Sequence, residues 1–326
     1  MGALVTGHEM FAAIAQGRAV DSTEFNLTDE QNQEREARLR SWLATQRGKG
    51  QRTQRLSAID AVRLVRDRIV AEQLKADPKV RERSDRFTNK RVLTAYETAL
   101  GMIEDNIRQG VNPLVRGPRL LKYSLEDDQD VALEDVNPDE EVGFAYLGSA
   151  VNPPIHGHFI PPMFALALLK LNFFIIRGQG KIAYKKVYRS EKVPTERRHL
   201  MAKLSMDGMS PLGRYTDFGS EPNNEAEAFL DMINLMEFNR DQRNHWVYLI
   251  GIENEARVTN YIKQFYTTFK EYEDKMSSKH RISIYWIQRG KFGEAMTQEK
   301  LEEYNERGFK QFGGKNRLAM GLLKHP

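Results

Sequence analysis

The chain has 326 residues, of which 40% are hydrophobic and 29% are charged, and its formal net charge at pH 7 is +4. This length and composition allow a buried core in one large domain or two ordinary ones. The chain contains no cysteine, which excludes disulfides, thiolate metal sites and thiol catalysis and favours a reducing compartment.

The N-terminal region lacks the pattern of a secretory signal, because no basic segment precedes a long apolar run. Residues 1–55 are polar and rich in arginine, and we expect a flexible N-terminal arm there. Gly2, followed by Thr6, fits the short pattern for myristoylation, which chance also produces often. The sequence leaves modification of Gly2 open.

Residues 56–122 have the apolar spacing of helices. Ser57 is suited to cap a helix whose apolar face carries Ile59, Val62, Val65 and Ile69. A second apolar face runs along residues 93–107 in steps of three and four, and Gly110 and Pro113 end that helix. We therefore expect a basic helical region over 56–122.

An acidic segment interrupts the chain. Residues 123–143 hold nine Asp and Glu and no Lys or Arg, and prolines follow at Pro153, Pro154, Pro161 and Pro162. Acidic and proline-rich segments resist regular structure. The range 123–160 is therefore predicted to be a connecting loop.

Residues 161–309 carry most of the apolar runs and are predicted to form a mainly helical C-terminal core. Residues 164–176 read as a buried helix, or a helix followed by a strand. The longer apolar run 160–176 is too short and interrupted to span a bilayer. Helices are expected after Asn223 or Asn224, over 258–276 and after Thr297, with short strands at 182–188, 246–252 and 281–287. A basic tail, 310–326, follows. The predicted fold class is mainly α with a few short strands: a helical core with a flexible N-terminal arm and C-terminal tail.

Positive charge is concentrated in two segments. Residues 35–91 hold 17 Lys and Arg against seven Asp and Glu, and residues 181–203 hold eight against two. Lysine and arginine bind phosphates, and tyrosines beside them can stack on bases of single-stranded nucleic acid. The alternative is a solvated helix face on which acids pair with the cations. The residues predicted to bind nucleic acid are Arg47, Arg52, Arg55, Arg63, Arg66, Tyr184, Lys185, Lys186, Tyr188, Arg189, Arg197 and Arg198.

Motifs of catalysis are missing from the sequence. There is no phosphate-binding loop of the G-x-x-x-x-G-K-[ST] type and no G-x-S-x-G nucleophile elbow. His156 and His158 could ligate a metal on a strand, but no third ligand follows at a known spacing, and the nearby prolines favour a turn. We predict no catalytic residue, no cofactor and no metal.

Together these patterns favour a structural RNA-binding protein that assembles with copies of itself and packages nucleic acid, as a viral coat or nucleocapsid subunit does. Its expected partners are RNA, bound through the phosphate backbone without sequence preference, and itself, with no membrane. Its expected location is the virion or host cytoplasm. The alternatives are a nucleic-acid-processing enzyme or accessory factor, and a helical adaptor between proteins.

Overall fold

The computed structural model describes residues 57–74, 89–111, 139–149, 151, 156–178, 195–216, 224–238, 240–288, 293 and 295–324. In these residues the central feature is a six-stranded, fully parallel sheet with strand order β3-β2-β1-β4-β5-β6. Helices follow the strands along the chain, so the fold is a doubly wound α/β fold. The predicted class, mainly α with a few short strands, is wrong.

The first half of the sheet runs outward from β1 to β3. It comprises β1 (Glu141–Ser149), α6 (His156–Leu169), β2 (Phe173–Gly178), α8 (Thr195–Asp207) and β3 (Gly213–Thr216). The chain then returns through α9 (Glu225–Phe238) to the other side of β1. The second half comprises β4 (Arg243–Ile252), α10 (Glu255–Tyr272), β5 (His280–Gln288), α12 (Gln298–Phe312) and β6 (Ala319–Leu323).

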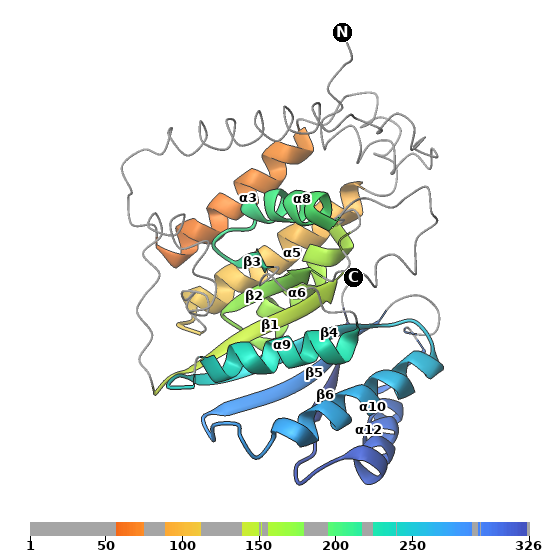
Figure 1. Cartoon of the computed structure of the whole chain (residues 1–326). Helices are drawn as coiled ribbons and strands as arrows, with labels where there is room; N and C mark the ends of the chain where they lie inside the picture. The colour runs from red at the N-terminus through yellow and green to blue at the C-terminus, as the bar shows by residue number, and fades with distance from the viewer. Residues whose placement is uncertain are drawn as a thin grey trace, which may run out of the picture.

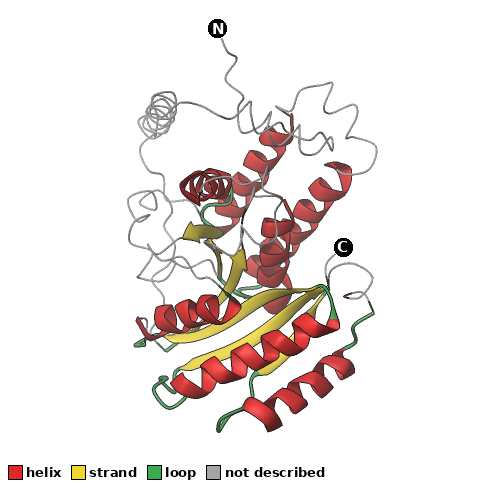
Figure 2. Ribbon diagram, turned by 45° about the vertical axis from the view of Figure 1, so that its right-hand side comes forward, coloured by secondary structure: helices red, strands yellow, loops and turns green. Residues whose placement is uncertain are grey.

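Two helices, α3 (Ala58–Leu74) and α5 (Asn89–Arg108), precede the sheet in the chain. They belong to one core with α6, α8 and one face of the sheet, whereas α9, α10 and α12 form a second core on the opposite face. Figure 1 and Figure 2 show the sheet between these two groups of helices. Helix α6 is buried from Phe159 to Ala167 because the sheet lies on one side of it and α5 on the other.

Strand β1 escaped prediction, and β2 was predicted only as one of two interpretations of 164–176, because most residues of these two strands are buried on both faces. Within β2 all six residues are buried, and β1 has a continuous buried run from Val142 to Leu147. Parallel strands covered by helices on both faces lack the alternation of polar and apolar residues that marks a half-exposed strand. Such runs resemble short pieces of buried helix.

Local capping signals were predicted correctly. The side chain of Ser57 accepts a hydrogen bond from the Asp60 amide at the start of α3, and Thr297 caps α12 by accepting from the Lys300 amide. Asn224, one of two candidates, caps α9 by accepting from the Glu227 amide. These bonds join residues three apart, so the local sequence is enough to specify them.

Several predicted ranges contain elements of the sheet. The range 123–160, expected to be a connecting loop, holds β1 and the start of α6, and Pro161 and Pro162 lie inside α6. The predicted flexible tail, 310–326, holds the end of α12 and strand β6, which pairs with β5. The N-terminal arm, 1–55, and the strand expected at 182–188 lie outside the described residues.

Candidate functional site

The order of the strands reverses between β1 and β4. From β1 the chain leaves toward β2 through α6 on one face, and from β4 it leaves toward β5 through α10 on the other face. In open α/β sheets, ligands bind outside the carboxyl ends of the strands at this reversal. We therefore take the carboxyl ends of β1 and β4, with the side chains around them, as the candidate site and call it the switch-point site.

Val151, two residues after the end of β1, departs from ordinary backbone geometry. Val151 is fully buried and has φ of 40°, a conformation that is costly for a β-branched residue. Its amide donates a hydrogen bond to the hydroxyl of Ser149, the last residue of β1, over 3.4 Å. Surrounding structure must hold such a turn in place, and strained turns of this kind cluster at ligand sites.

Helix α6 begins at the same edge of the sheet with His156. The Tyr96 hydroxyl, from α5, lies 3.0 Å from His156 Nδ1. Burial lowers the pKa of His156 and raises the pKa of Tyr96, so both groups are neutral at pH 7. If the phenol donates to Nδ1, the imidazole carries its proton on Nε2 and offers a hydrogen-bond donor at the start of α6.

Tyrosines and a carboxylate lie on the opposite face of the same strands. The Tyr248 hydroxyl on β4 donates a 2.6 Å hydrogen bond to Oε2 of Glu225, the first residue of α9. The Tyr146 ring on β1 stacks on the Tyr248 ring, with 5.7 Å between the centroids. Burial, together with the charge of Glu225, raises the pKa of Tyr248 and of the partly exposed Tyr261 on α10.

The carboxyl end of β2 carries a buried cation. Arg177 is fully buried, and its Nε and Nη2 donate to Asp231 Oδ2 over 3.0 and 2.8 Å, while Nη1 donates to the Gly178 carbonyl. Asp231 belongs to α9, so this ion pair joins the sheet to the returning helix. Its charge is balanced inside the protein rather than presented to solvent.

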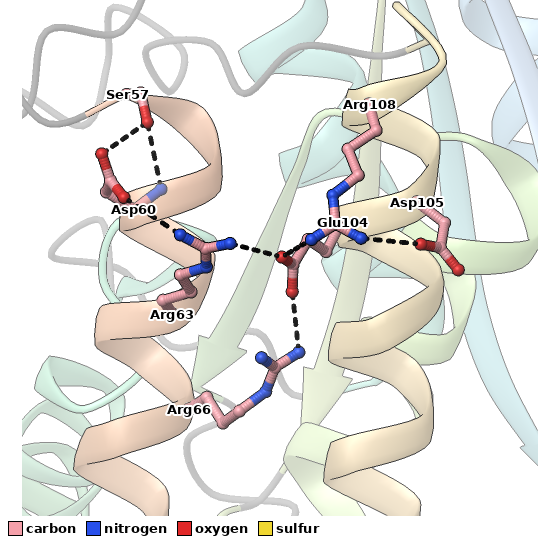
Figure 3. A network of polar contacts seen from close by, with 7 residues as sticks. All are labelled: Ser57, Asp60, Arg63, Arg66, Glu104, Asp105 and Arg108. Carbon is pink, nitrogen blue, oxygen red and sulfur yellow. Dashed lines mark hydrogen bonds and ion pairs between the residues drawn. The ribbon is translucent and has the colours of Figure 1, made fainter.

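Two of the predicted nucleic-acid-binding residues, Arg63 and Arg66, lie on α3 and share one carboxylate. Both donate to Glu104 on α5, over 3.3 and 3.0 Å, and Arg108 donates to it over 2.6 Å (Figure 3). Burial favours the neutral acid, but the hydrogen bond from Arg66 and the three positive charges lower the pKa of Glu104. Arg63 and Arg66 thereby join α3 to α5 through one buried carboxylate.

Arg198 of the second basic segment is fully buried in the structure. Arg197 lies in α8, and its side chain is not among the described ones. The remaining predicted residues lie outside the described ranges: Arg47, Arg52, Arg55, Tyr184, Lys185, Lys186, Tyr188 and Arg189. Among the predicted residues whose side chains are described, the structure therefore brings together only Arg63 and Arg66.

The residues of the switch-point site were not predicted, apart from the attention given to His156. One signal could have found them. From residue 141 onward, segments with apolar runs, such as 173–176 and 246–250, alternate with helical segments, which is the pattern of a parallel sheet. In that pattern the end of the first strand, at Ser149, is the first place to look for a ligand site.

The described part of the chain lacks both a cluster of metal ligands and a helix suited to cross a membrane. No group of three or more histidines and acids there is arranged to hold a metal ion. No helix among the described residues is both long and apolar enough to cross a bilayer. A scan against models of protein families finds no match for this chain, and a search of curated proteins finds none either.

Proposed function

We propose that this protein binds an adenosine-bearing ligand at the switch-point site. The observation that carries the proposal is the strand order itself: six parallel strands in the order 3-2-1-4-5-6 with helices on both faces. This order is that of dinucleotide-binding domains, in which the ligand crosses the carboxyl ends of the two central strands. The strained turn at Val151 and the start of α6 lie at those ends.

The sequence between β1 and α6 narrows the class of ligand that the switch-point site can bind. Dinucleotide sites bind pyrophosphate through backbone N–H groups of a G-x-G-x-x-G turn. Here Gly148 is followed by Ser149, and the sequence between β1 and α6 contains Pro153 and Pro154, which have no N–H to donate. Fewer donors favour a ligand without a pyrophosphate, such as adenosine, AMP or S-adenosylmethionine, over NAD or ATP.

Calorimetric titration with these five ligands tests the proposal. We expect adenosine, AMP or S-adenosylmethionine to bind more tightly than NAD or ATP, and to raise the unfolding free energy by about 2.7 kcal/mol at a concentration of 100 Kd. Ser149→Phe should weaken binding at least tenfold, because the new ring occupies the carboxyl end of β1. Arg243→Phe, at the amino end of β4, is the matched control and should bind normally.

The same titrations can also contradict the proposal. If none of the five ligands binds, or if Ser149→Phe folds normally and binds as the wild type does, the proposal is wrong. Circular dichroism of the two variants separates a lost site from a lost fold.

RNA packaging stays a prediction, because nine of the twelve side chains on which it depends lie outside the described ones. Purification without nuclease, followed by absorbance at 260 and 280 nm and electron microscopy, tests it directly. Neutralising Lys185, Lys186 and Arg189 should reduce the salt slope of binding to single-stranded RNA by about 2. An unchanged slope would exclude those three residues.

A further inference from the structure

We infer that Glu225 is the residue that accepts hydrogen bonds from the ribose hydroxyls of the bound ligand, and that Tyr248 is the residue that positions its carboxylate. The inference rests on the proposed function. It concerns the ribose, because the strand order alone does not show which side chain binds the sugar.

The usual ribose acceptor is missing among the described residues at the end of β2. In domains of this order an Asp or Glu at the end of β2 binds the 2′-hydroxyl. Here β2 ends with Arg177 and Gly178, and the buried guanidinium is held by Asp231 and the Gly178 carbonyl. A buried cation in an internal ion pair cannot accept a hydrogen bond from a sugar, so another element must supply the acceptor.

Glu225 has the position that this role requires. It begins α9 after the cap Asn224, is partly exposed, and is held by the fully buried Tyr248 through a 2.6 Å hydrogen bond. Tyr248 lies on β4 directly opposite Tyr146 of β1, so the carboxylate is placed over the two strands where the order reverses. A carboxylate oriented in this way accepts strong hydrogen bonds from hydroxyl groups.

The buried hydroxyl of Tyr146 is a second, independent indication. Its oxygen is buried and makes no well-formed hydrogen bond among the described residues, although the Arg177 guanidinium lies close enough to act on it as a hydrogen-bond donor. Burial raises its pKa, and the charges of Arg177, Asp231 and Glu225 all act on it. The hydroxyl therefore lies close to the same charged groups, where a ligand hydroxyl or a water would complete its hydrogen bonding.

Other carboxylates at the end of β4 are placed differently. Glu253 pairs with Arg257, and Glu255 accepts a hydrogen bond from Tyr304 of α12. These contacts direct both groups toward α10 and α12, away from β1. Among the described acids, Glu225 is therefore the best placed to meet a sugar lying across β1 and β4.

The test compares adenosine with 2′-deoxyadenosine and 3′-deoxyadenosine by calorimetric titration. The wild type should bind adenosine about tenfold or more tightly than either deoxynucleoside, because each lacks one hydrogen bond to a charged group. Glu225→Gln should bind adenosine about tenfold more weakly and should lose the preference for ribose. Tyr248→Phe should reduce the preference while leaving part of it, because the carboxylate remains without its orienting bond.

Glu227→Gln is the matched control. Glu227 lies in the same turn and contacts Asn224, so its loss affects the cap of α9 and should leave the ribose preference unchanged. Equal affinity of the wild type for all three nucleosides would overturn the role of Glu225 without using any variant, and the proposed function would stand. A full preference retained in Glu225→Gln would overturn it as well. If neither these nucleosides nor the earlier ligands bind, both proposals fail.

Discussion

His245, at the amino end of β4, makes a contact with a serine whose role is structural rather than catalytic. Its Nε2 lies 2.9 Å from the Ser283 hydroxyl, and its Nδ1 lies 3.1 Å from Arg281 Nη2. A guanidinium can only donate, so Nδ1 accepts and Nε2 carries the proton toward Ser283. A protonated Nε2 cannot activate a serine, so this Ser–His contact is structural.

The pKa of His245 predicts a pH dependence of stability. Burial and the charge of Arg281 lower it from 6.5 to about 4, although Glu141 acts to raise it. Above pH 6.5 the free energy of unfolding should be insensitive to this group. Between pH 6.5 and 4 it should fall by about 1–3 kcal/mol, because the unfolded chain binds a proton that the folded protein resists.

Chemical denaturation across this pH range checks the effect. His245→Gln should have a shallower loss of stability than the wild type. Part of the loss should remain, because burial also lowers the pKa of His156 and His280. Identical pH profiles for the variant and the wild type would exclude His245 as the source.

Glu104 should stabilise the contact between α3 and α5 while it is ionised. Because its folded pKa is lowered, the stabilisation is present above the ordinary value of 4.5 and is lost as pH falls through the folded value. Glu104→Gln should lower the free energy of unfolding at pH 7 by about 1–3 kcal/mol. Asp105→Asn, an exposed neighbour, should change it by less than about 0.5 kcal/mol in the same denaturation assay.

At the scale of elements, α10 and α12 approach closely at Gly308. A Cβ on Gly308 would lie 2.1 Å from Ile262 Cγ2, on a stiff β-branched side chain, whereas a Cβ on Gly101 of α5 would meet nothing within 4 Å. The two helical glycines therefore serve different purposes. Gly308 allows two helices to pack, and Gly101 has no such contact.

Alanine at each glycine should change stability in opposite directions. Gly101→Ala should stabilise the protein by about 0.5–1 kcal/mol through its better helix propensity. Gly308→Ala should destabilise it by about 1–3 kcal/mol, because α12 must move away from α10. Thermal unfolding of the two variants checks this, and a stabilised Gly308→Ala would show that the helices can separate without cost.

At the scale of the whole molecule, the outer helices and the sheet share a core. Leu100 of α5 is 1% exposed and belongs to the same cluster as Ala145 of β1 and Phe174 of β2. Trp246 and Trp286 lie in the other core, across the sheet. If the two cores unfold together, a destabilising substitution in α5 must also lower the unfolding midpoint that is measured in the core on the opposite face of the sheet.

Leu100→Ala should lower the free energy of unfolding by about 2–5 kcal/mol. Trp42, which lies outside the described residues, is first replaced by phenylalanine, so that tryptophan fluorescence reports only Trp246 and Trp286. Far-UV circular dichroism reports the helices. Both signals should shift to the same lower urea midpoint, as a cooperative unit requires. Separate midpoints would show that α3 and α5 melt independently of the sheet.

The features that could be predicted from the amino-acid sequence depend on residues close together in the chain. The caps Ser57 and Thr297 and the apolar faces of α5 and α10 are of this kind, because their contacts lie within one or two turns. The strand predicted at 281–287 also matches β5 closely, since its β-branched and aromatic residues are concentrated.

The sheet and the site depend on contacts between residues far apart in the chain. Strand β1 follows an acidic segment, and its order beside β2 and β4 depends on contacts between distant residues. Arg177 meets Asp231 across 54 positions, and Arg63 meets Glu104 across 41, so neither pair can be read from local spacing. Parallel pairing and ion pairing depend on which surfaces the whole chain buries, and that is why local patterns predicted mainly helices and did not identify the partners of these arginines.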